Sequence, residues 1–250
     1  MGAALVGGLL NADWSAHDLA VVEVLASRAE ELRGIFPGVM VSDVVPSCAA
    51  AVIAVKPPDV AAACTVAAAA GATRLLSIAA GVPLSTLQAA AGPKVAVVRA
   101  MPNTPALVGQ GAAAISAGAT ANDGDMAWAE SILGAVGTVV RVPETQLDAV
   151  TGLAGSGPAY LFLIAESLIA AGVEAGLSQA DSEALVTQLF VGSSALLRER
   201  GEPAELRKMV TSPGGTTAAG LRVLDDRGVR EAFVEAVMAA KARSIELGQG

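Results

Sequence analysis

A loop of glycine and hydroxyl residues near residue 215 offers the chemistry of a small-anion site. It reads Val210-Thr-Ser-Pro-Gly-Gly-Thr-Thr217. The proline stops a helix, and the two glycines allow close approach of a ligand to the backbone. One of the two threonines can cap the helix that follows, whose free N–H groups attract a carboxylate or phosphate. The residues expected to hold this anion are Ser212, Gly214, Gly215, Thr216 and Thr217. An ordinary Pro-Gly turn before a capped helix is the alternative.

Three further motifs follow apolar, strand-like runs. They are Val55-Lys-Pro57, Ser77-Ile-Ala-Ala-Gly81 and Arg99-Ala-Met-Pro-Asn-Thr-Pro105. Open α/β sheets bind ligands at the carboxyl ends of their strands, so together these motifs suggest a cofactor cleft. Lys56 could reach a cofactor phosphate or ribose, although a solvated lysine at a strand end fits equally well. Asn103, between two prolines, carries an amide that both donates and accepts.

The expected sites contain few acid–base groups. The only histidine, His17, is remote in sequence from every motif, and Ser156 and Ser212 have no evident histidine base, which argues against a hydrolytic triad. There is neither a P-loop nor a metal-ligand spacing, so no metal is predicted. N–H donors and hydroxyls without a base suit hydride transfer to an electrophilic carbon, such as that of a protonated imine.

The first part of the chain alternates strand-like and helix-like segments, which predicts βαβ units and a parallel sheet. Strands are expected at 19–24, 51–55, 74–78, 94–99, 112–117 and 138–142, with the strand at 51–55 buried on both faces. Helices are expected at 27–36, 58–71, 83–91 and 123–133. The fold class is therefore α/β, with a dinucleotide-binding domain over residues 1–148.

The rest of the chain predicts only helices and a second domain over residues 149–250. The helices are expected at 158–176, 178–200, 203–210, 216–226 and 229–247. Pro158, after Gly155-Ser-Gly157, marks the start of the first of them. Many of their residues are alanine, glycine or serine, so burial against a second subunit is favoured and a homodimer or larger homo-oligomer is expected.

Composition excludes several classes of function. The net charge is −8, which argues against a nucleic-acid partner. No run of about 18 uncharged apolar residues predicts a membrane span. The best stretch, 160–177, is interrupted by Glu166 and Glu174. No secretory signal is present, and a cytoplasmic location is expected. Cys48 and Cys64 are interpreted as small buried residues.

Taken together, the motifs resemble the pyrroline-5-carboxylate reductase family. The resemblance is carried in the family's order by Val55–Pro57, Ser77–Gly81, Arg99–Leu107, Gly155–Tyr160 and Val210–Thr217. It implies a Rossmann-like domain, an all-helical dimerisation domain, and reduction of 1-pyrroline-5-carboxylate to L-proline, the last step of proline synthesis. The implied cofactor is NADP(H), with NAD(H) as the alternative.

The resemblance also implies roles for particular residues. Thr217 would orient the substrate through its carboxylate or ring nitrogen, as the catalytic residue. Ser27 and Arg28 would receive a 2′-phosphate, whereas Glu23 would favour the free ribose of NAD. The residues expected to contact the cofactor are Gly2, Ser27, Arg28, Val55, Lys56, Pro57, Ala79, Ala80 and Asn103.

The beginning of the sequence departs from the family pattern. Met1-Gly-Ala-Ala-Leu5 corresponds to the first helix, and Gly2 to the last glycine of G-x-G-x-x-G, so the first strand and two glycines are absent. We expect a start site assigned too late, with a shortened, impaired protein as the alternative. Strands beside Val21 and Val52 would lack a partner, which is an aggregation hazard.

Two other functions remain open. A related imine or β-hydroxyacid dehydrogenase is disfavoured, because such hydroxyacid enzymes need a lysine on the first long interdomain helix and none occurs between Pro158 and Arg200. A catalytically impaired or non-catalytic dimerising protein would keep the helices but lose dinucleotide binding.

Overall fold

The computed structural model describes residues 1–248 and divides the chain into two compact units. The α/β unit comprises Met1–Ser156 together with Val237–Gly250, and the helical unit comprises Gly157–Ala236. The last part of the chain therefore belongs with the first. Each unit is described by itself below.

A five-stranded sheet forms the centre of the α/β unit, in the order β3-β4-β5-β6-β7. Its strands are β3 (Ala50–Ile53), β4 (Arg74–Ser77), β5 (Ala96–Met101), β6 (Gly111–Ala117) and β7 (Gly137–Arg141). The pairs β3–β4, β4–β5 and β6–β7 are parallel, as expected, whereas β6 is antiparallel to β5. The expected α/β class with a Rossmann-like sheet is confirmed.

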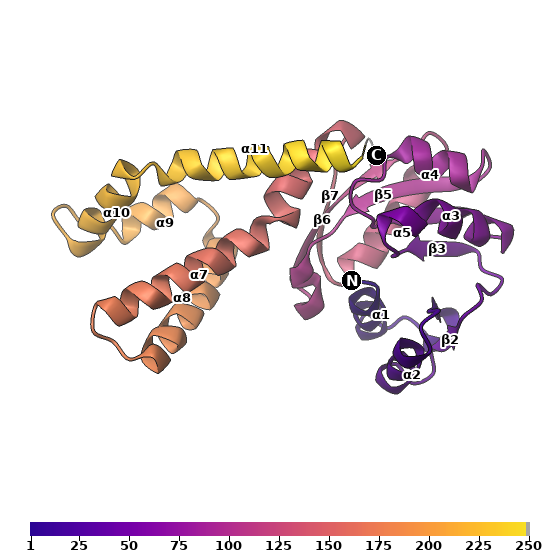
Figure 1. The fold of residues 1–250 in the computed structure, drawn as a ribbon, viewed down its shortest axis with the longest axis horizontal. Helices are drawn as coiled ribbons and strands as arrows, with labels where there is room; N and C mark the ends of the chain where they lie inside the picture. Colours follow the sequence, from indigo (N-terminus) through magenta and orange to yellow (C-terminus); the bar gives the residue numbers. More distant parts are fainter. Residues whose placement is uncertain (249–250) are drawn as a thin grey trace. The chain divides into compact units, whose positions relative to one another are not determined.

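Helices cover both faces of this sheet (Figure 1). On β4, Leu75 and Leu76 point to opposite faces and are both buried, as are Val97 and Val98 on β5. Leu75 and Val97 pack with α3 (Val60–Ala69) and α4 (Leu84–Ala91). Leu76 and Val98 pack with α1 (Gly2–Asn11) and α5 (Asp123–Gly134). This sandwich fixes the loops at the strand ends.

A separate two-stranded parallel sheet joins β1 (Ala20–Val22) to β2 (Met40–Ser42), the latter not anticipated from the sequence. α1 packs against both sheets, through Leu5 and Leu9 on one side and Val6 on the other. α2 (Ala26–Ile35) covers the small sheet. Among the described residues, β1 and β3 each pair along one edge only.

The expectation that the strand at 51–55 is buried on both faces is wrong. Only Ile53 of β3 is fully buried, and the other three residues are half-buried. The reason is that β3 is an edge strand, paired only with β4, so its other side lacks a neighbour among the described residues.

The helical unit contains helices joined by short loops, and its described residues include no strand. The helices are α7 (Gly157–Glu174), α8 (Gln179–Arg200), α9 (Pro203–Met209) and α10 (Thr216–Asp226), followed by α11 (Val229–Leu247), which returns to the α/β unit at Val237. These bounds agree closely with the helices expected from the sequence. α7 and α8 form a hairpin whose close contact places Gly172 against Ser182.

The expected start of a helix at Pro158 is confirmed to within one residue, because α7 begins at Gly157. The chain is already helical in α6 (Leu147–Val150), passes through a π-helical turn at Thr151–Gly155, and continues into α7. Pro158 has no N–H to donate to the carbonyl of Ala154, four residues earlier. That carbonyl instead accepts a hydrogen bond of 3.0 Å from the Asn103 side chain, so the missing donor of the proline leaves no unpaired carbonyl.

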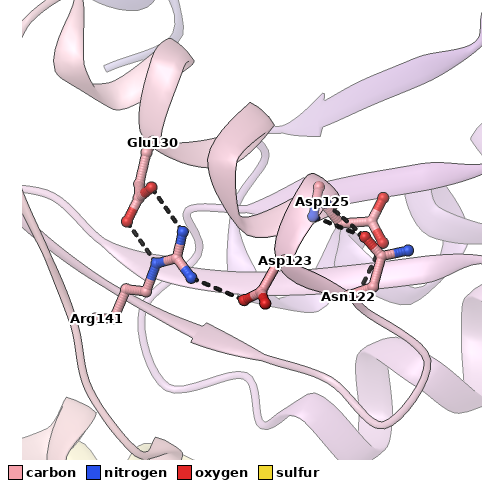
Figure 2. Close-up of polar contacts among 6 residues, drawn as sticks. Asn122, Asp123, Asp125, Glu130 and Arg141 are labelled. Carbon is pink, nitrogen blue, oxygen red and sulfur yellow. Dashed lines mark hydrogen bonds and ion pairs between the residues drawn. The ribbon is translucent and has the colours of Figure 1, made fainter.

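An arginine on β7 fastens this strand to α5 (Figure 2). Arg141 donates two hydrogen bonds to Glu130, of 2.6 and 2.8 Å, and one of 3.1 Å to Asp123. Asn122 and Asp125 form a capping box at the start of α5. The hydrogen bond from Arg141 lowers the pKa of the Glu130 carboxyl.

We predict that Glu130→Gln lowers the stability of the α/β unit slightly at neutral pH. Because the folded-state pKa of Glu130 lies below its ordinary value of 4.5, the stabilisation is present above that pH and is lost as pH falls through the folded pKa. Thermal melts at pH 7 and pH 3 measure this: the wild type should exceed the variant only at pH 7. Asp43→Asn, at an exposed site, is the control. An equal deficit at both pH values would contradict the prediction.

Candidate dinucleotide and anion sites

The strand register gathers the expected cofactor residues at one edge of the sheet. Ile53 of β3 pairs with Ser77 of β4, which pairs with Arg99 of β5. The chain leaves each strand just beyond this row. The loops carrying Val55–Pro57, Ala79–Ala80 and Asn103 therefore emerge side by side, as expected for a ligand edge.

The start of α1 lies at the same edge. A Cβ built on Gly2 would be 3.4 Å from the Cβ of Ala54, which directly follows β3. The first-turn N–H groups of α1 thus stand next to the end of β3, where a helix dipole favours a phosphate. Lys56 is exposed, and among the described residues no carboxylate pairs with it, so its ammonium is free to meet an anion.

The loop after β4 presents one small residue to solvent. Ser77 is fully buried, and its hydroxyl accepts a 3.4 Å hydrogen bond from the backbone N–H of Ala79. Ala79 is also buried, whereas Ala80 is exposed, and Gly81 has a φ of +77° that favours glycine. A methyl group at this position leaves room for a flat ring beside the loop.

Asn103 has a structural role, bridging two backbone groups, that the sequence pattern did not reveal. Its amide nitrogen donates to the carbonyl of Ala154 at 3.0 Å, and its amide oxygen accepts from the N–H of Ala112 at 2.8 Å. The side chain therefore joins the end of β5 to β6 and to the π-helical turn. Close by, a Cβ on Gly155 would lie 2.5 Å from the terminal methyl group of Met101, so that side chain packs directly against the π-helical turn.

Ser27 and Arg28 occupy the first turn of α2, directly after β1. Arg28 forms an ion pair with Glu31, and this hydrogen bond raises the pKa of the guanidinium. The Glu23 carboxylate accepts a 3.0 Å hydrogen bond from the N–H of Leu25. A positive and a negative group thus both stand beyond β1, and both cofactor types remain compatible with this end.

The expected anion loop is built as a tight turn in the helical unit. The N–H of Gly215 donates to the carbonyl of Ser212 at 3.0 Å, with Pro213 and Gly214 at the central positions. Gly214 has a φ of +73°, as a type II turn requires. A Cβ on Gly215 would collide with the Ser212 hydroxyl, so glycine at this position allows that hydroxyl to lie close to the start of α10.

The expectation that Thr216 or Thr217 caps α10 is wrong. The N-cap is Gly215, without a side-chain hydrogen bond, and both threonines are already helical. The reason is that the turn leaves Gly215 extended, with φ −78° and ψ 173°, so helical angles begin one residue later. Both hydroxyls are exposed, and no described residue pairs with them or with the first N–H groups of α10. The loop thus keeps its donors free.

Two open depressions occur on the described part of the α/β unit, with volumes of about 630 and 440 Å³. Both are lined by Glu144 and Ala117, and neither is lined by an expected site residue. The strand-end loops are better candidates for a ligand site than these open depressions, because the strand register brings small residues and the unpaired Lys56 ammonium together there.

One buried ion pair escaped the sequence analysis. Arg99, which is 7% exposed, lies 2.9 Å from Glu144, whose carboxylate also accepts from the N–H of Leu84 at 2.6 Å. In the sequence, Arg99 stands out only as the first residue of its motif. Nothing local in the sequence pairs it with a carboxylate 45 residues away.

The sheet edge and the loops at its strand ends define the class, a Rossmann-type dinucleotide-binding protein with a helical second unit. Comparison with known proteins agrees with this class. Residues 144–247 match a family model described as pyrroline-5-carboxylate reductase dimerisation.

A pyrroline-5-carboxylate reductase from Corynebacterium melassecola is 36% identical over 258 aligned positions, covering 100% of this chain and 96% of that protein. The structure of a pyrroline-5-carboxylate reductase from Coxiella burnetii superposes with a TM-score of 0.91 at 32% identity, covering 98% and 93% of the two chains. The Plasmodium falciparum pyrroline carboxylate reductase, solved with NADP bound, gives 0.84 at 29% identity over 99% and 94%. The chain belongs to the pyrroline-5-carboxylate reductase family.

We predict that Asn103→Ala destabilises the α/β unit by about 1–3 kcal/mol, because the N–H of Ala112 and the carbonyl of Ala154 lose their partner. Chemical denaturation followed by circular dichroism measures the loss. Thr104→Ala, at the exposed neighbouring residue, is the matched control and should match the wild type. Equal stability of the two variants would show that the two Asn103 hydrogen bonds do not stabilise the α/β unit.

Proposed function

We propose that this chain reduces 1-pyrroline-5-carboxylate to L-proline with a nicotinamide dinucleotide as the hydride donor. The observation that carries the proposal is the Ser212–Thr217 loop, where the hydroxyls of Thr216 and Thr217 and the first N–H groups of α10 have no partner among the described residues. Membership of the reductase family at 36% identity over the whole chain supports it. An exposed anion site at a helix start suits the carboxylate of a small cyclic imino acid.

The residues at the sheet edge fit a dinucleotide. We infer that Gly2 and Lys56 face its phosphates, that Ala79 and Ala80 leave space for its flat ring, and that Ser27 and Arg28 stand by the ribose. The remaining proposed contacts are Val55, Pro57 and Asn103. A bound NADPH or NADH supplies the hydride. We favour NADP(H) because a relative of 29% identity was solved with NADP bound, and NAD(H) stays possible because Glu23 can bind a free ribose hydroxyl.

In the helical unit, the substrate carboxylate would accept hydrogen bonds from the first N–H groups of α10 and from the hydroxyls of Ser212 and Thr216. Thr217 would orient the ring through the carboxylate or the ring nitrogen. The protonated imine is already electrophilic, so these groups need only bind and orient it. A cytoplasmic location stays a prediction from the sequence.

A non-catalytic dimerising protein is the competing function. It would retain the fold of the helical unit but show no dinucleotide binding and no turnover. Oxidation of NADPH and NADH in the presence of 1-pyrroline-5-carboxylate separates the two proposals, together with a direct titration of the protein with each dinucleotide. Binding without turnover would contradict the reductase proposal.

We also propose that the helical unit is a homodimer interface. Between Gly157 and Ala236, all of which the structure describes, Val186 is the only buried apolar residue. The exposed large apolar side chains include Leu161, Phe162, Leu163, Leu185, Leu189, Val223, Leu224 and Val234. So much exposed apolar surface marks a contact site, and a second copy fits the match to a dimerisation family.

A membrane is the other environment that could cover apolar helices. The helix Glu144–Glu174 is long and apolar enough to cross a membrane by length and composition alone, which is weak evidence. It carries Glu166, Pro158 and a π-helical turn, and the exposed apolar residues extend over α8, α10 and α11 as well. A surface spread over several helices favours a protein partner.

We predict that Thr217→Ala raises the KM for 1-pyrroline-5-carboxylate by about 10-fold to 100-fold, because a hydrogen bond to a charged group is lost. The KM for the dinucleotide should change little. Steady-state kinetics with each substrate varied in turn measures both. Thr211→Ala is the matched control, since the Thr211 hydroxyl donates to the carbonyl of Arg207 in the preceding helix α9. Unchanged substrate kinetics in Thr217→Ala would refute the assignment.

We predict that Phe162→Asp converts the oligomer to a smaller species, because burying an unpaired carboxylate in an apolar interface is costly. Light scattering coupled to size-exclusion chromatography, without detergent, measures the mass. Val66→Asp makes the same change at an exposed site of the α/β unit and should leave the mass unchanged. A wild-type monomer would contradict the dimer, and solubility only in detergent would favour the membrane.

A further inference from the structure

The last turn of α11 lies directly against the loop that follows β4. A Cβ built on Gly81 would be 3.4 Å from the Cβ of Leu247, and one built on Gly248 would be 2.8 Å from the carbonyl oxygen of Gly81. The two backbones therefore touch. The close approach requires glycine at 248, and the positive φ favours it at 81. Within this loop Ala79, Gly81 and Val82 are buried, and Ala80 is left exposed.

A buried serine holds this turn in place. Ser244 is 4% exposed, and its hydroxyl donates a 2.7 Å hydrogen bond to the Asp148 carboxylate on α6. About two turns before Ser244 in α11, the carbonyl of Val237 would lie 2.5 Å from a Cβ built on Gly152, so α11 is also packed tightly against the π-helical turn. The end of α11 is thus fastened to the α/β unit at several points.

The same carboxylate belongs to a polar chain that reaches the other end of the loop. Asp148 lies 4.0 Å from the guanidinium of Arg99, and Arg99 pairs with Glu144 at 2.9 Å. Glu144 accepts from the N–H of Leu84, the first residue of α4. The loop between β4 and α4 is therefore held at Leu84 by Glu144 and at Gly81 by the end of α11, and both supports meet at Arg99.

We propose that Ser244 is a positioning residue for the dinucleotide, acting through the loop 77–84. This inference rests on the proposed function, which places Ala79 and Ala80 against the cofactor. Ser244 itself touches no ligand. By fixing the last turn of α11, it keeps Gly81 in its left-handed conformation and Ala80 at the sheet edge. Loss of this support loosens dinucleotide binding and leaves the substrate loop in the helical unit unchanged.

The test compares Ser244→Ala with Ser244→Thr, which keeps the hydroxyl, in the full chain. NADPH binding is measured by fluorescence titration, and the KM for 1-pyrroline-5-carboxylate at saturating NADPH. We expect Ser244→Ala to weaken NADPH binding by about 2-fold to 10-fold, the value of one hydrogen bond, with the substrate KM within about twofold and rescue by Ser244→Thr. Glu246→Ala, which removes only the exposed pair with Arg243, is the control.

Hydrogen exchange of the backbone amides in 77–84 gives a readout that needs no ligand. Faster exchange there in Ser244→Ala, with unchanged exchange in β5, supports the coupling even if the wild type binds no dinucleotide. A wild type that binds no dinucleotide would contradict only the proposed function. Unchanged exchange, or NADPH affinity equal to the wild type in a wild type that binds it, overturns the proposal. If Ser244→Ala fails to fold, Gly248→Ala, which must push Gly81 away, replaces it with the same expected results.

Discussion

The in-register pairing of β3, β4 and β5 is the constraint on which the rest of the α/β unit depends. Backbone hydrogen bonds set Ile53, Ser77 and Arg99 in one row, and the loops that carry Lys56, Ala80 and Asn103 start beyond that row. Because side chains alternate along β4 and β5, the same register delivers apolar residues to both faces and lets helices cover them. A slip by one residue would turn these faces over and scatter the loops.

The sequence was sufficient to predict those elements whose structure depends on residues close together in the chain. Continuous apolar runs gave β4 and β5, and the Gly176 and Gly201 breaks gave the helices of the helical unit. The loop at 212–217 was expected as a turn with free donors, and it is one. Family resemblance supplied the reaction, which no periodicity could have given. The individual site residues stay predictions.

Apart from the cap of α10, which the local turn at Gly215 decides, what the sequence analysis missed involves partners distant in sequence. The helix start at Pro158 was expected, but not that Asn103, 55 positions away, satisfies the carbonyl that the proline leaves free. Arg99 finds Glu144 and Asp148 only once β5 and α6 are packed together. β3 read as a central strand because its residues are apolar, while its burial depends on which strands flank it. No local pattern contains this information.

The division of the chain into units has a consequence for synthesis and folding. The α/β unit is discontinuous: 80 residues, Gly157–Ala236, intervene between its two segments. During synthesis, the sheet and its helices leave the ribosome well before residues 237–248 are made. The Asp148 carboxylate therefore lacks its contact with Ser244, and the loop at Gly81 lacks its contact with the end of α11, until the whole helical unit has been translated. Completion of the α/β unit is in this way postponed until the helical unit has been synthesised.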